Sequence, residues 1–141
     1  KEYSLEVRTN LTIAKAFNAS DYVQALRART RSMYNFKRAL ADVDVLVTPT
    51  TACAAPFIRP DALPFGESDL TTLLEIMRFA TPANFTGLPA ISFPAGYTAA
   101  GLPVGFQVMA KPWHEHVLLR IARAAEGVVE RRAPKIFYPL L

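Results

Sequence analysis

The chain has 141 residues, of which 51% are hydrophobic and 20% charged, and its formal net charge is +4. This composition excludes an intrinsically disordered chain and allows one domain with its own core. The single cysteine excludes an internal disulfide, and no apolar run reaches the length of a membrane-spanning helix. The apolar fraction is high for a free-standing domain of this size, which indicates that some apolar surface meets further protein.

Two helices are predicted in the first forty residues. Apolar positions among polar ones predict the first over residues 4–17, and a near-helical apolar stripe predicts the second over residues 20–41, with Ser20 as its N-cap. The second helix carries a basic cluster at Arg27, Arg29, Arg31, Lys37 and Arg38. A solvated helix face is the preferred interpretation, and attraction to anionic lipid headgroups is the alternative. Nucleic-acid binding is not expected, because no recognised motif accompanies the charge.

The run Val43–Val47 is short, apolar and β-branched, which is typical of a strand buried on both faces in a mainly parallel sheet. The loop over residues 48–67 is longer than a simple connection needs. In open α/β sheets, ligands tend to bind beyond the carboxyl ends of strands. Thr50, Thr51 and Cys53 are therefore candidate pocket residues. The pattern alone supports equally well the alternative that they only satisfy their own backbone.

A third helix, capped by Ser68 or Asp69, is predicted over residues 70–79. Its apolar face consists of Leu70, Leu73, Leu74 and Met77. Such a face packs in the core by default. Met77 could instead line a tunnel for an apolar ligand, which makes it the fourth candidate pocket residue.

The stretch 84–111 is expected to organise the chain. Its two apolar segments, 90–94 and 103–109, alternate with period two and are separated by a glycine-bearing loop, which predicts a β-hairpin or two neighbouring strands. Residues 81–86 are expected to lead into this hairpin. A last helix is predicted over residues 115–130, and the apolar tail 133–141 is expected to dock against a neighbouring surface.

The reactive groups of the sequence exclude several chemistries. The sequence contains neither a phosphate-binding glycine loop nor a Gly-x-Ser-x-Gly nucleophile elbow. His114 and His116 are two positions apart and so do not face together on a helix, and no cysteine or carboxylate pattern completes a metal site. Ser92 and Cys53 would need a base within hydrogen-bond reach to act as nucleophiles, and the sequence nominates none. The residues alone predict an α/β piece without a complete active site, metal or cofactor.

Longer stretches resemble a known family. DVDVLVTPTTACAAP at 42–56 and FATPANFTGLPAISFPAGYTAAGLPVGFQVMAKPWHEHVLLRIARAAE at 79–126 resemble the C-terminal third of the amidase signature family. The opening SLEVRT, GESDLTTLLEIMRF at 66–79, KPWHEHVLL at 111–119 and the closing PKIFYPLL resemble the plant-type fatty acid amide hydrolases. The resemblance implies an α/β fold in which residues 1–141 supply the C-terminal portion of a large mixed β-sheet flanked by helices. This portion is an incomplete segment of a single amidase domain, without an internal boundary.

The resemblance also bears on the site. Members of the family hydrolyse amides with a Ser–cis-Ser–Lys triad, in a Gly/Ser-rich core that precedes the part represented here. No lysine of this chain lies in a matching context and no GGSS-like run occurs, so no catalytic residue is assigned and the chain alone is expected to be inactive. The resemblance implies that the loop carrying Thr50, Thr51 and Cys53 borders the substrate cavity.

The implied function is hydrolysis of fatty acid amides such as N-acylethanolamines. The alternatives are another amidase of the family, such as a glutamyl-tRNA amidotransferase of the A type, and a non-catalytic α/β module that binds an apolar ligand. The expected partners are a lipid amide substrate, the N-terminal part of the same enzyme, a membrane surface, and a second copy in a homodimer. An intracellular location is expected, with contact to a membrane.

Overall fold

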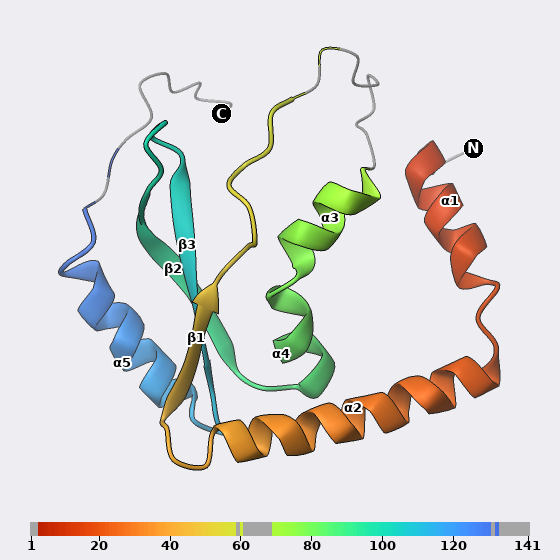
Figure 1. The fold of residues 1–141 in the computed structure, drawn as a ribbon, viewed down its shortest axis with the longest axis horizontal. Coiled ribbons are helices and arrows are strands. Elements are labelled where there is room, and N and C mark those ends of the chain that lie inside the picture. The colour runs from red at the N-terminus through yellow and green to blue at the C-terminus, as the bar shows by residue number, and fades with distance from the viewer. Residues whose placement is uncertain (1–2, 59, 61–68, 131, 133–141) are drawn as a thin grey trace.

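The computed structural model describes residues 3–58, 60, 69–130 and 132 (Figure 1). The expected α/β class is confirmed in this part of the chain. Predicted features at residues 59, 61–68 and 133–141, including the Ser68 cap and the apolar tail, lie outside the described residues. The elements are α1 (Leu5–Ala14), α2 (Ala19–Ala39), β1 (Val45–Pro49), α3 (Leu70–Met77), α4 (Ala80–Thr86), β2 (Ala90–Tyr97), β3 (Pro103–Ala110) and α5 (Glu115–Glu126).

Helix α2 is capped by Asn18 instead of the predicted Ser20. The Asn18 side-chain oxygen accepts hydrogen bonds from the backbone N–H groups of Ser20 and Asp21, at 2.8 and 3.1 Å. The Asp21 carboxylate in turn accepts a hydrogen bond from the Asn18 N–H at 2.9 Å. This reciprocal capping box satisfies more of the helix's first N–H groups than a lone serine cap, which explains the earlier start.

The three strands form one antiparallel sheet in the order β1–β3–β2. The predicted hairpin is confirmed as β2 and β3, and β2 runs three residues beyond its predicted end. The prediction of a doubly buried strand in a parallel sheet is wrong for β1, which pairs antiparallel with β3 and leaves Val47 exposed. A β-branched apolar run fits either kind of pairing, so it does not fix the direction of the neighbouring strand.

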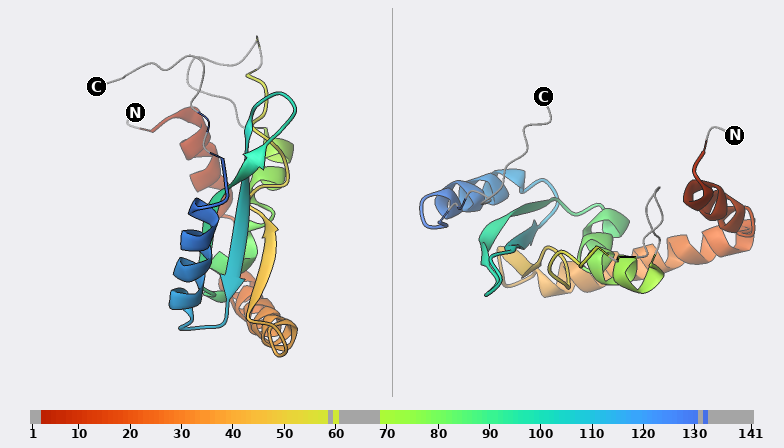
Figure 2. Two further views of the ribbon diagram at one scale, coloured as in Figure 1. Left: turned by 90° about the vertical axis from the view of Figure 1, so that its left-hand side faces the viewer. Right: turned by 90° about the horizontal axis from the view of Figure 1, so that it is seen from above.

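Helices lie on both sides of the sheet (Figure 2). Helix α5 covers one face, where Leu118 packs with Val108 and Ala110 in the buried core. On the other face, the Gln107 side chain is only 5% exposed. Its amide nitrogen donates to the Phe79 carbonyl oxygen at 2.8 Å and to the Thr48 hydroxyl at 3.2 Å. The amide thereby connects the central strand to β1 and to the junction of α3 and α4.

Helix α4 occupies the segment that the sequence pattern predicts only as a lead into the hairpin. It has seven residues, with Pro82 in its first turn, where the missing N–H costs nothing. Gly87, with φ of 77°, ends it in the left-handed conformation. A helix of two turns is too short to show a clear apolar period, which is why the sequence pattern does not indicate it.

The apolar face of α3 is exposed, in contrast to the place in the core that the pattern predicts for it. Leu70, Leu73, Leu74 and Met77 are between 41% and 71% exposed. The helix is held through its backbone, since the Glu75 carbonyl oxygen accepts a hydrogen bond from the Ala52 N–H at 3.1 Å. The apolar stripe of α3 is therefore left uncovered by the described residues, although its spacing is that of a core-facing helix.

Replacement of the buried amide should weaken the fold. We expect Gln107→Met in the full-length protein to lower the free energy of unfolding by about 1–3 kcal/mol, because the part-buried Phe79 carbonyl oxygen loses its donor. The measurement is thermal or denaturant unfolding. Gln24→Met, on the exposed surface of α2, is the matched control and should change the free energy by less than about 0.5 kcal/mol. Equal effects of the two variants would contradict this role of Gln107.

A second prediction concerns the close approach of β3 to the end of β1. A Cβ atom on Gly105 would lie 2.6 Å from the Thr50 hydroxyl oxygen and 2.9 Å from its Cβ. Gly105→Ala should therefore destabilise the protein by about 1–3 kcal/mol, and Thr50→Ala in the same chain should restore part of the loss. A Cβ atom on Gly127 would meet its nearest neighbour at an ordinary 3.5 Å. Gly127→Ala should thus leave the unfolding midpoint unchanged or slightly raised.

Candidate functional site

Three of the four candidate residues lie in the loop directly after β1. The Thr50 N–H donates to the Gly105 carbonyl oxygen at 2.9 Å, which continues the contact of β1 with β3 beyond Pro49. The Thr50 hydroxyl oxygen is buried and has no hydrogen-bond partner among the described residues. The Thr51 hydroxyl donates to the Cys53 carbonyl oxygen at 2.7 Å, so this residue does satisfy its own loop backbone. Cys53 is a half-buried free thiol.

The fourth candidate, Met77, is the last residue of α3 and its side chain is partly exposed. The hydrogen bond from the Ala52 N–H to the Glu75 carbonyl oxygen joins the loop to this helix. The structure thus brings the loop and the end of α3 to one junction. It fixes this junction from two sides, through Gly105 on the sheet and Glu75 on the helix.

A hollow of about 910 Å³ lies elsewhere, and none of the four candidates lines it. It lies between α2, the connection from α4 to β2, and the turn after β3. Its apolar walls include Met33, Leu40, Leu88 and Pro112, and its cationic groups are Arg29, Lys37 and Lys111. No pattern in the sequence marks this hollow, because its walls come from three segments that are far apart in the chain.

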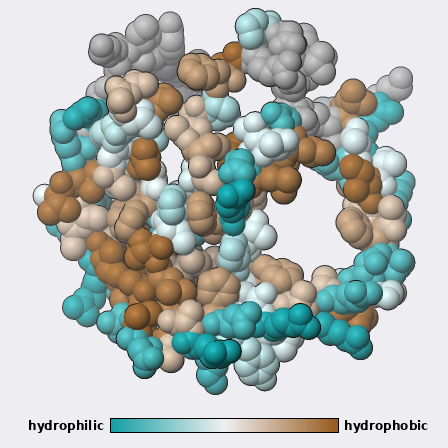
Figure 3. Space-filling model, in the orientation of Figure 1, coloured by the Kyte–Doolittle hydropathy of each residue, from teal (hydrophilic) through white to brown (hydrophobic). Residues whose placement is uncertain are grey.

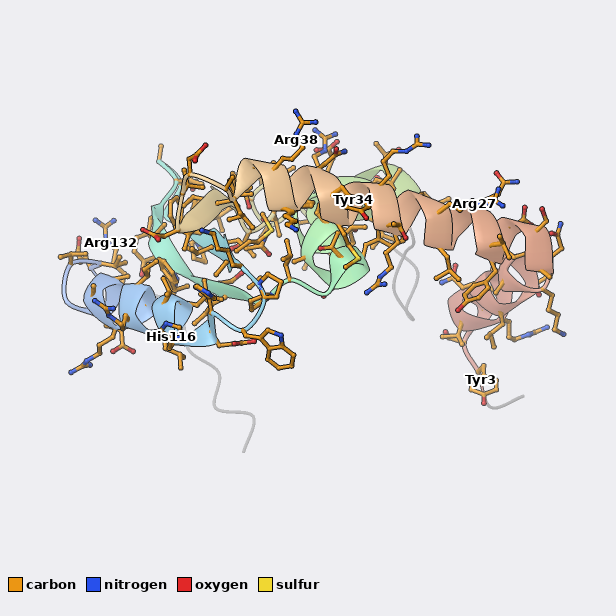
Figure 4. The ribbon with its side chains drawn as sticks, turned by 90° about the horizontal axis from the view of Figure 1, so that it is seen from below. Tyr3, Arg27, Tyr34, Arg38, His116 and Arg132 are labelled. Atoms are coloured by element: carbon orange, nitrogen blue, oxygen red, sulfur yellow. The ribbon has the colours of Figure 1, made fainter. Side chains whose placement is uncertain are left out.

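The basic cluster on α2 divides into two groups. Arg29 is half-buried, and its Nε donates to the Phe85 carbonyl oxygen at 2.8 Å, which fastens α2 to α4. Arg27 and Arg38 point away from the rest of the molecule (Figure 4), and neither makes an ion pair with any residue that the structure describes. These two arginines fit a solvated face or an anionic partner equally well.

The two histidines do not form a metal site in the described part of the chain. Their ring centroids are 5.5 Å apart, closer than two positions on one helix would predict, because His114 precedes α5 and only His116 lies within it. No group of three or more His, Cys, Asp or Glu side chains comes together among the described residues. Within the same residues, no helix is long and apolar enough to span a membrane.

One shifted ionisable pair lies outside the candidate site. A hydrogen bond from Arg132 lowers the pKa of the exposed Glu130 carboxyl, and the positive charge of Arg132 acts in the same direction. The backbone N–H of Arg132 also donates to the Tyr97 hydroxyl at 2.7 Å, and its guanidinium lies 5.0 Å from the centre of that ring. These contacts fasten the chain after α5 to the end of β2.

Comparisons with known proteins give a consistent result. The Amidase family model matches residues 2–119. Fatty acid amide hydrolases of Medicago truncatula and Arabidopsis thaliana are 46% and 45% identical to this chain, and each match covers 98% of the chain and 23% of the relative. The crystal structure of a glutamyl-tRNA(Gln) amidotransferase chain from Thermotoga maritima matches with a TM-score of 0.68 at 29% identity, over 92% of this chain and 28% of that protein.

The chain therefore spans less than a third of the length of these relatives. The matches confirm the resemblance found in the sequence, and the shared fold is that of one part of a larger amidase structure. Because the Amidase family model matches most of the sequence, the chain belongs to the amidase family.

Proposed function

We propose that this chain is the C-terminal part of a longer amidase that hydrolyses the carbon–nitrogen bond of fatty acid amides such as N-acylethanolamines. The observation that carries the proposal is the 46% identity to the Medicago truncatula fatty acid amide hydrolase over nearly the whole chain. Residues 1–141 would belong, together with the preceding part, to a single domain without an internal boundary.

The chemistry would come from the preceding part of the enzyme. There, a serine attacks the amide carbonyl, the amine leaves, and water then hydrolyses the acyl-serine to release the acid. A bridging serine and a lysine transfer the protons in both steps. This mechanism needs no metal or cofactor. The chain described above would supply scaffold and one wall of the acyl pocket, and no catalytic group.

Thr50, Thr51, Cys53 and Met77 are the residues we assign to that wall. The assignment is supported by the two backbone hydrogen bonds that hold the loop, from Thr50 to Gly105 and from Ala52 to Glu75. A wall fixed on both sides keeps its shape when an apolar chain lies against it. The thiol of Cys53 and the thioether of Met77 suit an acyl chain better than a short polar amide.

A second candidate function is glutamine hydrolysis, as part of a glutamyl-tRNA amidotransferase of the A type. It is favoured by the structural match to the Thermotoga maritima protein over 92% of this chain. Such an enzyme needs a polar pocket for a short amide, which the apolar pair Cys53 and Met77 does not favour. A non-catalytic module that binds an apolar ligand is the third alternative.

The full-length protein separates these functions. We expect it to release ethanolamine from a long-chain N-acylethanolamine and to release no ammonia from glutamine. The 141-residue chain alone should hydrolyse neither substrate and should aggregate, because its open sheet edges and apolar faces lack their neighbours. Glutamine hydrolysis without turnover of the lipid amide would favour the amidotransferase function. A soluble, cooperatively melting monomer of the isolated chain would favour the non-catalytic module.

Enlarging one pocket residue should alter the acyl-chain preference. We expect Cys53→Phe in the full-length enzyme to lower kcat/KM for a long-chain acyl amide by about 10- to 100-fold, and for a short-chain amide much less, because the ring occupies space along the acyl chain. Ala55→Phe, at an exposed position of the same loop, is the matched control and should have little effect. Cys53→Ser should retain activity, whereas its complete loss would assign the thiol a chemical role instead.

A further inference from the structure

Helix α3 carries an apolar stripe that nothing in the described chain covers. Its residues follow helical spacing at the first, fourth, fifth and eighth positions, namely Leu70, Leu73, Leu74 and Met77. Leu70 is 61% exposed and Leu74 is 71% exposed. A stripe of this kind on a soluble protein marks a surface that meets another apolar surface.

The helix cannot turn to bury its stripe. Asp69 caps its N-terminus by accepting from the N–H groups of Thr71 and Thr72, at 2.9 and 3.3 Å. The Glu75 carbonyl oxygen binds the loop after β1, and the Phe79 carbonyl oxygen, two residues after the helix, binds the Gln107 amide. The cap would turn with the helix, but a rotation that brought the leucines onto the sheet would break the bonds of Glu75 and Phe79 to the other segments.

Helix α1 forms a second uncovered apolar surface across an opening from α3. Figure 3 shows this opening through the molecule, bounded by α1, α2 and α3. The exposed apolar residues of α1 and of the turn after it are Leu5, Val7, Leu11, Ile13 and Phe17. They are spread around the helix and do not follow one stripe. A helix that is apolar on several sides is normally buried within a larger protein.

From these surfaces we infer that the three leucines of the α3 stripe and the apolar sides of α1 are docking surfaces for an apolar segment of the preceding part of the same polypeptide, while Met77 at the end of the stripe stays with the pocket wall. This inference rests on the proposed longer amidase, though not on its substrate. The length of chain required is available, since the match covers only 23% of the Medicago truncatula relative and the rest of that protein lies outside it. A segment of this kind would enter the opening and cover both helices together.

The charges around α3 favour this occupant over a lipid bilayer. Surfaces that bind anionic membranes surround their apolar groups with a surplus of lysine and arginine. Beside the stripe, the charged side chains of α3 and its ends are Asp69, Glu75 and Arg78, and Arg78 is already paired with Glu75. The unpaired arginines Arg27 and Arg38 project from α2 instead (Figure 4).

Cysteine labelling of the full-length enzyme tests the inference. Leu74→Cys and Leu119→Cys are matched, because the two leucines are 71% and 64% exposed in this chain. Under native conditions without lipid, we expect a maleimide to modify position 74 at least about tenfold more slowly than position 119, since only position 74 is covered. The two sites should react equally after denaturation. Equal rates in the native enzyme would overturn the inference.

Two further outcomes are equally decisive. Protection of position 74 that disappears on dilution, or that needs added anionic vesicles, would overturn the inference in favour of a second copy or a membrane.

In a second pair of variants, Leu74→Glu should lower Tm by at least about 5 °C, because it places a charge in a covered apolar contact. Leu119→Glu should change Tm by less than about 2 °C. Since none of these measurements uses turnover, protection at position 74 in an enzyme that does not hydrolyse lipid amides would support docking and contradict only the proposed substrate.

Discussion

The buried amide of Gln107 is the contact on which the rest of the arrangement depends. It lies on the central strand β3 and donates to the Thr48 hydroxyl on β1 and to the Phe79 carbonyl oxygen between α3 and α4. A buried amide that loses its partners bears the full cost of desolvation, so the helices cannot slide along the sheet. That fixed position brings Glu75 against the loop after β1, and the candidate pocket wall follows from it.

The described part of the chain has only a small core. Only a small group of apolar side chains is buried among the described residues, namely Leu40, Ala83, Val108, Met109, Ala110 and Leu118. Many of the larger apolar residues of α1, α2 and α3 are exposed, although 51% of the sequence is hydrophobic. Composition alone indicates that some apolar surface meets further protein, and the structure shows which helices carry that surface. Among the described residues, the apolar stripe of α3 thus faces outward and adds nothing to the core.

The sequence predicts those parts of the fold that depend on local pattern. Strand alternation predicts β2 and β3, and long apolar stripes predict α2 and α5, because each signal lies within one element. The start of α2 differs from its prediction because the Asp21 carboxylate, three residues after Asn18, accepts a hydrogen bond from the Asn18 N–H and so stabilises Asn18 as the cap. The direction of β1 differs because an apolar run does not specify its neighbours. Which way the stripe of α3 faces is decided by hydrogen bonds to distant segments, which no local pattern contains.

The candidate site shows the same division between local and distant information. A strand followed by a long loop is enough to nominate Thr50, Thr51 and Cys53, but the close approach of Gly105 and the bond from Ala52 to α3 depend on the folded sheet. Both anchors lie within this chain, and they hold the start of the loop at Thr50 and Ala52. Relatives named for fatty acid amides and for glutamyl-tRNA(Gln) belong to the same family as this chain. The fold of this part of the chain is shared with the Thermotoga maritima amidotransferase chain, so this fold alone does not distinguish one amide from another.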